Sequence, residues 1–458
     1  MNRQNPSQSF NPTNPSSDKK ETNLSRVLAG LIVVIALMLS LGAWVAGAQT
    51  HVSPAPHADA VSSIRSDTYM PHIPPRAIAY TRTQRALGLT GMAWNLVGLW
   101  VFVRSGASVR LRDGVYRLVR LPVPEDGPPA FRALLVFYGL YTLILMLWNM
   151  PFGLAELATE WKYGFSHESL GMYLGDAAKN WGIGLLVAPL LCGLAWLVMR
   201  SPRRWWLWMW GLTLPLLIGV LILQPIVIAP LFNEYKPLSV GPLRTKILAL
   251  AARAGVPNAD VFVEDTSRRS AHVNAYVTGV GPAARIVLND TAIMMLPEDQ
   301  LLAMLGHEMG HYVEKHVWYG LLSGAIGSGA FFYLAFRGWP LLDRRTRQSK
   351  TGLRGPLDLA TLPLLFLYLN IALLIQDPIA NAESRYMEHR ADAFGLRVTG
   401  LDTATARLMV GFAERDFSDP DPPALLHFWF GSHPTLSERI AFALSGEVKP
   451  DVAPRPHP

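Results

Sequence analysis

The chain is dominated by long blocks of apolar residues, and these blocks constrain its fold more than any other feature. A helix that crosses about 30 Å of hydrocarbon needs roughly 20 mostly apolar residues. Trp181 and Trp205 stand at block ends, where interfacial anchoring favours tryptophan. The pattern predicts a mainly α-helical, polytopic membrane protein with about seven transmembrane helices, and it excludes a soluble enzyme. The apolar blocks are residues 27–48, 87–103, 133–150, 181–199, 205–228, 317–336 and 357–375.

The first block could be an anchor or a signal peptide. It ends in Ala46-Gly47-Ala48, which resembles a signal-peptide cleavage site. Its apolar stretch is longer than the roughly 7–15 residues of a signal peptide, so we expect an uncleaved anchor. Residues 1–24 are rich in Asn, Ser, Pro and Gln, and residues 448–458 are rich in Pro. Both ends are therefore predicted to be disordered.

The positive charge of the chain indicates membrane topology. Lys and Arg total 41 against 34 Asp and Glu, and much of the excess lies in residues 104–132, 200–204 and 337–354. In a seven-span protein these three connections share one face with the N-terminal tail, and the positive-inside rule makes that face cytoplasmic. The polar segment 233–316 and the chain beyond residue 377 would lie opposite. We expect a lipid bilayer as a partner, and no nucleic acid.

The polar segment 233–316 interrupts the membrane region and carries the signals of a small α+β unit. Its predicted elements are a helix over 242–254, strands over 260–263, 274–278 and 285–288, and a helix that starts at Pro297. The expected organisation is a tail (1–24), transmembrane helices 1–5 (25–232), a metallopeptidase segment (233–316), transmembrane helices 6–7 (317–376), the C-terminal part of the peptidase domain (377–447) and a tail (448–458).

The strongest chemical signal is His307-Glu308-Met309-Gly310-His311, within the helix that starts at Pro297. Residues four apart share a helix face, so His307 and His311 can hold one Zn²⁺ while Glu308 reaches a water on the metal. Zinc lowers the pKa of that water from about 15.7 toward 7. Glu308 can then accept its proton and pass one to the leaving amine, as a peptidase requires.

A catalytic zinc needs a third protein ligand. The extension with a third histidine is missing, because Glu314 and Val317 stand where it requires Gly and His. A thiolate set is excluded as well, since Cys192 is the only cysteine and lies in an apolar block. The same count excludes a disulfide.

The segment 381–392 offers better candidates, because two membrane crossings return it to the first helix. Glu388 and Asp392 are four residues apart and share a face. Glu388 suits the metal, which leaves Asp392 to accept a hydrogen bond from a ligand imidazole. Glu383 and His389 are rival ligands that spacing alone does not exclude.

With these residues in place, the chain resembles the Ste24 type of CAAX prenyl protease, in the M48 class of zinc metallopeptidases, over about residues 134–444. This resemblance implies a ring of membrane helices that encloses a water-filled chamber, with one zinc per chain at one end and Glu388 as its third ligand. The segments that carry it, besides the His-Glu-x-x-His helix, are 162–165, 230–233, 270–279, 285–291, 381–392, 432–434 and 439–440.

The resemblance also implies roles for residues outside the metal set. His433 would donate to the developing oxyanion, and Arg439 would face the same carbonyl of the substrate. The strand around Asn274 and Ala275 would pair with an extended substrate backbone. Asp392 would support catalysis beside the metal.

Sidedness and substrate stay open at this point. Eukaryotic members of the resembled family place zinc at the cytosolic end, opposite to the side that the charge pattern indicates. We expect a multi-pass integral membrane protein, located in the inner membrane if the chain is bacterial. The substrate is a peptide or protein: either a prenylated C-terminus or a damaged or mistargeted membrane or secretory polypeptide, as in quality control. We expect a monomer.

A membrane protein without catalytic activity, in which zinc is structural, is the alternative class. A closed site of that kind needs a fourth protein ligand, for which His316 or His389 would be candidates. Glu308 argues against this alternative, since a structural site has no use for an adjacent base.

Overall fold

The computed structural model describes residues 69–201, 203–279 and 284–450. Within them, six helices are long and apolar enough to span a membrane. They coincide with six of the seven predicted blocks, and the block 27–48 lies outside the described residues. The mainly α-helical, polytopic fold is confirmed. The six helices are α2 (Pro75–Arg104), α4 (Phe131–Tyr163), α5 (Leu170–Met199), α6 (Trp205–Leu223, continued by a π-helical turn over Gln224–Ile228), α10 (His316–Arg347) and α11 (Leu362–Thr399).

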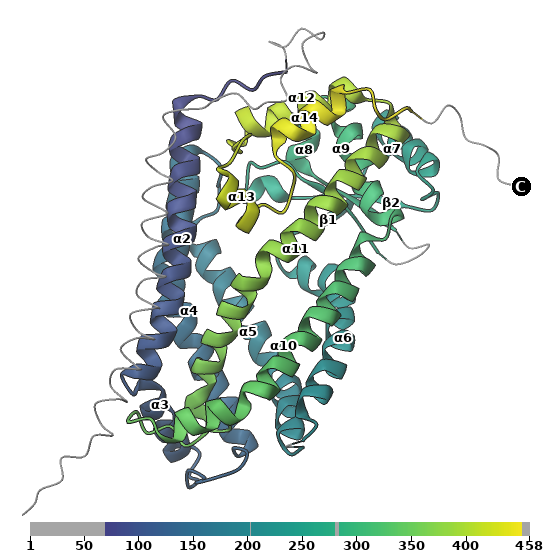
Figure 1. The fold of residues 1–458 in the computed structure, drawn as a ribbon. Helices are drawn as coiled ribbons and strands as arrows, with labels where there is room; N and C mark the ends of the chain where they lie inside the picture. The colour runs from purple at the N-terminus through teal and green to yellow at the C-terminus, as the bar shows by residue number, and fades with distance from the viewer. Residues whose placement is uncertain (1–68, 202, 280–283, 451–458) are drawn as a thin grey trace, which may run out of the picture.

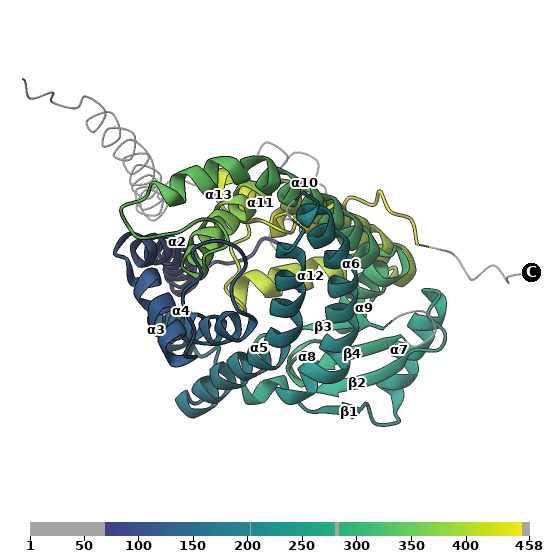
Figure 2. The same ribbon diagram turned by 90° about the horizontal axis from the view of Figure 1, so that it is seen from below.

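These helices are longer than their apolar blocks. At 1.5 Å per residue, the 38 residues of α11 extend for about 57 Å, almost twice the hydrocarbon thickness. The surplus projects from one end and carries polar residues, so α11 crosses residue 377 without a break and enters the peptidase unit. Seen end-on in Figure 2, the long helices stand in a ring. The water-filled chamber stays a prediction.

A four-stranded sheet and shorter helices form the peptidase unit at one end of the ring, the top in Figure 1. The strand order is β1-β2-β4-β3; β2 and β4 are parallel, and the other two pairs are antiparallel. The strands are β1 (Tyr235–Pro237), β2 (Asp260–Glu264), β3 (Ala275–Thr278) and β4 (Arg285–Asn289). The helices are α7 (Pro242–Arg253), α8 (Asp290–Met295), α9 (Glu298–Val313), α12 (Asp402–Glu414), α13 (Ala424–Phe430) and α14 (Leu436–Leu444).

The predicted helix over 242–254 and the three predicted strands are present within one or two residues, whereas β1 was not expected. The core of the unit joins the sheet to α7, α9, α11, α12 and α14. Ile286 and Leu288 of β4 are fully buried, as are Leu305 and Met309 of α9. A β-strand that contributes Ile, Val and Leu to both of its faces fits an inner position in a sheet, and β4 holds that position.

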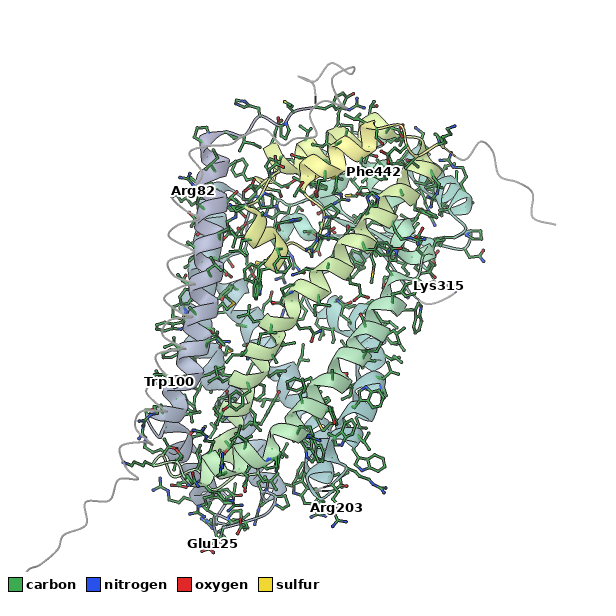
Figure 3. All side chains as sticks on the ribbon, in the orientation of Figure 1. Arg82, Trp100, Glu125, Arg203, Lys315 and Phe442 are labelled. Atoms are coloured by element: carbon green, nitrogen blue, oxygen red, sulfur yellow. The ribbon has the colours of Figure 1, made fainter. Side chains whose placement is uncertain are left out.

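The predicted basic connections lie at the opposite end of the ring, where Figure 3 labels Arg203 and Glu125. Several of these arginines also have structural partners. Arg112 of α3 (Ala107–Leu118) is buried and pairs with Asp358, while Arg354 donates to backbone carbonyls of the 120–130 connection. Part of the positive charge therefore holds this end of the helices together, in addition to any effect on topology.

Close contact between α9 and α11 is made possible by glycine. A Cβ on Gly395 would lie 2.9 Å from the backbone nitrogen of His307, and one on Gly310 would lie 3.1 Å from Ala391 Cα. Gly306 lies on the same side of α9, where a Cβ would meet Thr399 at 2.5 Å. Because these neighbours include backbone atoms, the two helices can approach this closely only without side chains at the contact.

We expect Gly395→Ala to destabilise the protein by about 1–3 kcal/mol, because the added methyl meets backbone and must push the helices apart. Thermal unfolding of detergent-purified protein measures this. Gly114→Ala in α3 is the matched control, since its Cβ would meet no atom within 4 Å. The control should be neutral or stabilising by up to about 1 kcal/mol. Equal behaviour of the two variants would contradict the close contact.

Candidate metal centre

Three predicted ligands meet where α9 and α11 pack together. His307 Nε2 and His311 Nε2 lie 3.1 Å apart; His307 Nε2 is 3.3 Å from Glu388 Oε2, and His311 Nε2 is 3.3 Å from Glu388 Oε1. Four-residue spacing brings the two imidazoles to one face of α9, and the glycine contact brings Glu388 of α11 opposite them. Among the described residues, this is the group of three His, Cys, Asp or Glu side chains that could hold a metal ion.

The arrangement fits a tetrahedral cation. Ligand atoms about 2.0–2.1 Å from a tetrahedral zinc are roughly 3.3–3.4 Å from one another. The 3.1 Å between the two imidazole nitrogens, and the 3.3 Å from each of them to a different oxygen of Glu388, are of that size. Glu388 is buried, and its Oε2 has no hydrogen-bond partner, which is costly for a carboxylate unless a cation completes it. Two neutral imidazole nitrogens and a carboxylate oxygen are also the donor set of many catalytic zinc sites.

Asp392 holds His307 from the side away from the ligand cluster. Its Oδ1 lies 2.8 Å from His307 Nδ1, so the imidazole donates there and leaves Nε2 free for a metal. Burial alone lowers the pKa of His307, but the carboxylates of Asp392 and Glu388 outweigh it and raise that pKa to about 9. The two carboxylates therefore stabilise positive charge at His307.

Arg439 is placed differently from the sequence-based expectation. Its guanidinium is buried and donates two hydrogen bonds to Asp392, from Nε to Oδ2 at 2.9 Å and from Nη2 to Oδ1 at 2.7 Å. The paired geometry compensates the buried charge of Asp392 and fixes the carboxylate. This position favours a supporting role behind His307 over the expected contact with substrate.

Glu308 and His433 lie beside the ligands. Burial raises the pKa of the half-buried Glu308, which makes its carboxylate a stronger base. His433 Nε2 lies 3.3 Å from Glu388 Oε1, and its Nδ1 lies 2.8 Å from the Ser432 hydroxyl. Desolvation lowers the pKa of His433, which favours its neutral imidazole. If Ser432 donates to Nδ1, the Nε2–H of His433 points into the site.

The predicted substrate strand is an edge. β3 is last in the strand order, and Ala275 is its first residue. Asn274 precedes it, with its side chain exposed and its carbonyl accepting from the Asn289 backbone nitrogen. Backbone groups on the other side of β3 have no strand partner in the described sheet, so the strand can receive an extended peptide.

The rival ligands do not join the cluster. Glu383 is absent from the described metal group, and the exposed His389 packs against the ring of Phe442 at 4.3 Å. His316 is buried, but its Nδ1 contacts His311 Nδ1, on the far side of that ring from Nε2. Among the described residues, neither His316 nor His389 joins the metal group as a fourth protein ligand.

Two residues that hold the His433 loop were missed from the sequence. Asn381 donates to the Trp429 carbonyl at 2.6 Å, and Arg385 donates to the Gly431 carbonyl at 2.6 Å. Residues 381, 385, 388 and 392 are separated by 4, 3 and 4, so they share one face of α11. That periodicity was visible in the sequence and could have identified both.

Comparisons with known proteins agree with this geometry. The peptidase family M48 model matches residues 237–447, and the CAAX prenyl protease N-terminal model, five membrane helices, matches residues 64–234. A Bacillus subtilis protein named "Uncharacterized metalloprotease YhfN" is 33% identical over 374 residues, 81% of this chain and 85% of that protein. The chain belongs to the M48 peptidase family. The resemblance to Ste24-type proteases is confirmed.

Further relatives support the same assignment. CAAX prenyl protease 1 of Saccharomyces cerevisiae is 26% identical over 384 residues, 79% of this chain and 83% of that protein. The crystal structure of S. mikatae Ste24p superposes with a TM-score of 0.74 at 23% identity, covering 91% of this chain and 97% of the other, which supports the fold. This M48 peptidase is therefore a multi-pass integral membrane metalloprotease that acts on a peptide or protein.

We expect Glu388→Ala to lower metal affinity at least about tenfold, because it removes the carboxylate that faces both imidazoles. Glu383→Ala, one helical turn and a half away on α11, should retain the metal. Metal analysis of both purified variants against the unmodified protein decides the matter. Equal metal content in the two variants would place the third ligand elsewhere.

Proposed function

We propose that this M48 peptidase is a zinc endopeptidase whose single Zn²⁺ is held by His307, His311 and Glu388. The observation that carries the proposal is the buried Glu388 carboxylate, whose Oε2 faces His307 Nε2 and whose Oε1 faces His311 Nε2, each at 3.3 Å. Among the described residues, Oε2 has no hydrogen-bond partner. Zinc, when bound, would act as a Lewis acid that lowers the pKa of water toward 7. One chain contains the whole ligand set, which supports a monomer as the active unit.

Glu308 is the proposed base. It stands next to a ligand on the same helix, and its raised pKa increases its affinity for a proton taken from the attacking water. The same carboxyl group then donates that proton to the leaving amine, which restores the starting charge of the site. Asp392 and Arg439 act behind the ligands by keeping the proton of His307 on Nδ1.

The substrate would bind as an added strand along β3, with its backbone beside Asn274 and Ala275. Backbone pairing tolerates many sequences, which suits a peptidase with several polypeptide substrates. The yeast relative is named CAAX prenyl protease 1, so a prenylated C-terminal peptide is the first substrate class that we propose. Casein, which has no prenyl group, represents the quality-control alternative.

Glu308→Gln should keep the bound metal and lower the rate of peptide cleavage about 10²–10⁴-fold, since it removes the base and leaves every ligand in place. Metal analysis and cleavage of a prenylated peptide and of casein by detergent-purified protein measure both effects. Glu298→Gln, in the first turn of the same helix, is the matched control and should retain activity. Unchanged turnover in Glu308→Gln would refute the assigned role.

His433→Ala should lower kcat by about 10²–10³-fold with little change in bound metal, because one donor to the oxyanion is lost. His433→Gln, whose amide can still donate from nearly the position of Nε2, should recover part of the rate. Steady-state kinetics of both variants test this expectation. A similar loss in both, or a loss that appears only in KM, would count against transition-state stabilisation by His433.

A further inference from the structure

His316 contacts the metal centre from behind and has no role in the mechanism above. Its Nδ1 lies 3.0 Å from His311 Nδ1, and the two rings are nearly perpendicular, at 79°. The residue is 6% exposed, which is unusual for a histidine at the end of a membrane-spanning helix. Since His311 presents Nε2 to Glu388, its contact with His316 uses the one ring nitrogen that remains.

The backbone is shaped to make this contact. In a continuous helix, a residue five positions after His311 would be rotated by about 140° from it and would face away. Here α9 ends at Val313, and Lys315 adopts a left-handed conformation with φ of 60° before α10 begins at His316. A lysine in that conformation is strained, so the sharp turn is held by its surroundings.

The protons along this contact can be assigned without conflict. When His311 Nε2 is a ligand, its Nδ1 carries the hydrogen and must donate it. His316 Nδ1 is then the acceptor, and its own hydrogen lies on Nε2, 3.4 Å from Glu314 Oε2. Glu314 is in turn held by Arg390 at 2.6 Å and Arg397 at 3.6 Å, both from α11.

We propose that His316 is a positioning residue that fixes the tautomer and ring orientation of His311, as Asp392 does for His307. The inference rests on the proposed zinc site and deepens it: each imidazole ligand has a dedicated acceptor on its Nδ1. A ligand without such an acceptor rotates more freely, and loss of comparable acceptors lowers metal affinity about 10–100-fold. Because His316 is also the first residue of α10, it connects a membrane helix directly to a metal ligand.

Two amide substitutions separate this role from simple packing. In His316→Asn the side-chain oxygen can occupy the place of Nδ1 and still accept from His311, whereas in His316→Gln the amide reaches the place of Nε2 and that acceptor is lost. The zinc Kd of the detergent-purified full chain is measured by competition with a chelator. We expect His316→Gln to raise Kd about 10–100-fold and His316→Asn to stay within about threefold of the unmodified protein.

Thermal unfolding of the metal-free proteins provides the second readout. If His316 positions His311, the two variants should be equally stable without metal. If its role is purely structural, both variants should be less stable and their zinc Kd values should be equal. The exposed His72→Gln is the control and should bind zinc normally. Equal Kd values for His316→Asn and His316→Gln would overturn the inference. Absence of zinc binding by the unmodified protein would instead contradict the proposed function itself.

Discussion

The structure depends on one steric constraint, the close approach of α9 and α11 at Gly306, Gly310 and Gly395. Two ligands come from a helix of the peptidase unit and the third from a helix that crosses the membrane region, so the site exists only where these helices touch. A side chain at Gly395 would collide with the backbone of His307 itself. The glycines, which carry no side chain, therefore set the distance between the ligands of the two helices.

The charged residues around the ligands are brought together by the same helix packing. Asp392 is buried between an imidazole and a guanidinium, and each of its oxygens accepts at least one hydrogen bond. A buried carboxylate with this many donors stays ionised, and its charge is compensated locally. Glu388 Oε2 has no hydrogen-bond donor among the described residues and faces His307 Nε2 at 3.3 Å, and this asymmetry between two carboxylates on the same helix face distinguishes the candidate metal ligand from its support.

Much of this was accessible from the sequence, because apolar length and four-residue spacing are local signals. They predicted six of the described membrane helices, the His-Glu-x-x-His helix and the edge strand. The length of α11 was not accessible, since its second half is polar and hydropathy alone ends the helix near residue 375. The pairing of Arg439 with Asp392 was not accessible either: it joins residues 47 positions apart, and only the packed fold brings α14 against α11.

Because α11 is continuous, movement of its membrane-spanning part is transmitted to the part that carries Glu388. Leu362 and Glu388 are 26 residues apart on one helix, about 39 Å at 1.5 Å per residue, so a tilt of one degree of a rigid helix would displace the carboxylate by about 0.7 Å. Asn95 of α2 donates to Asn370 at 3.3 Å and holds α11 against α2 in its membrane part. Pro378, between Asn370 and Glu388, cannot donate a backbone hydrogen bond within the helix. The neighbouring helices that pack against α11 and set its tilt therefore also set the position of the Glu388 carboxylate.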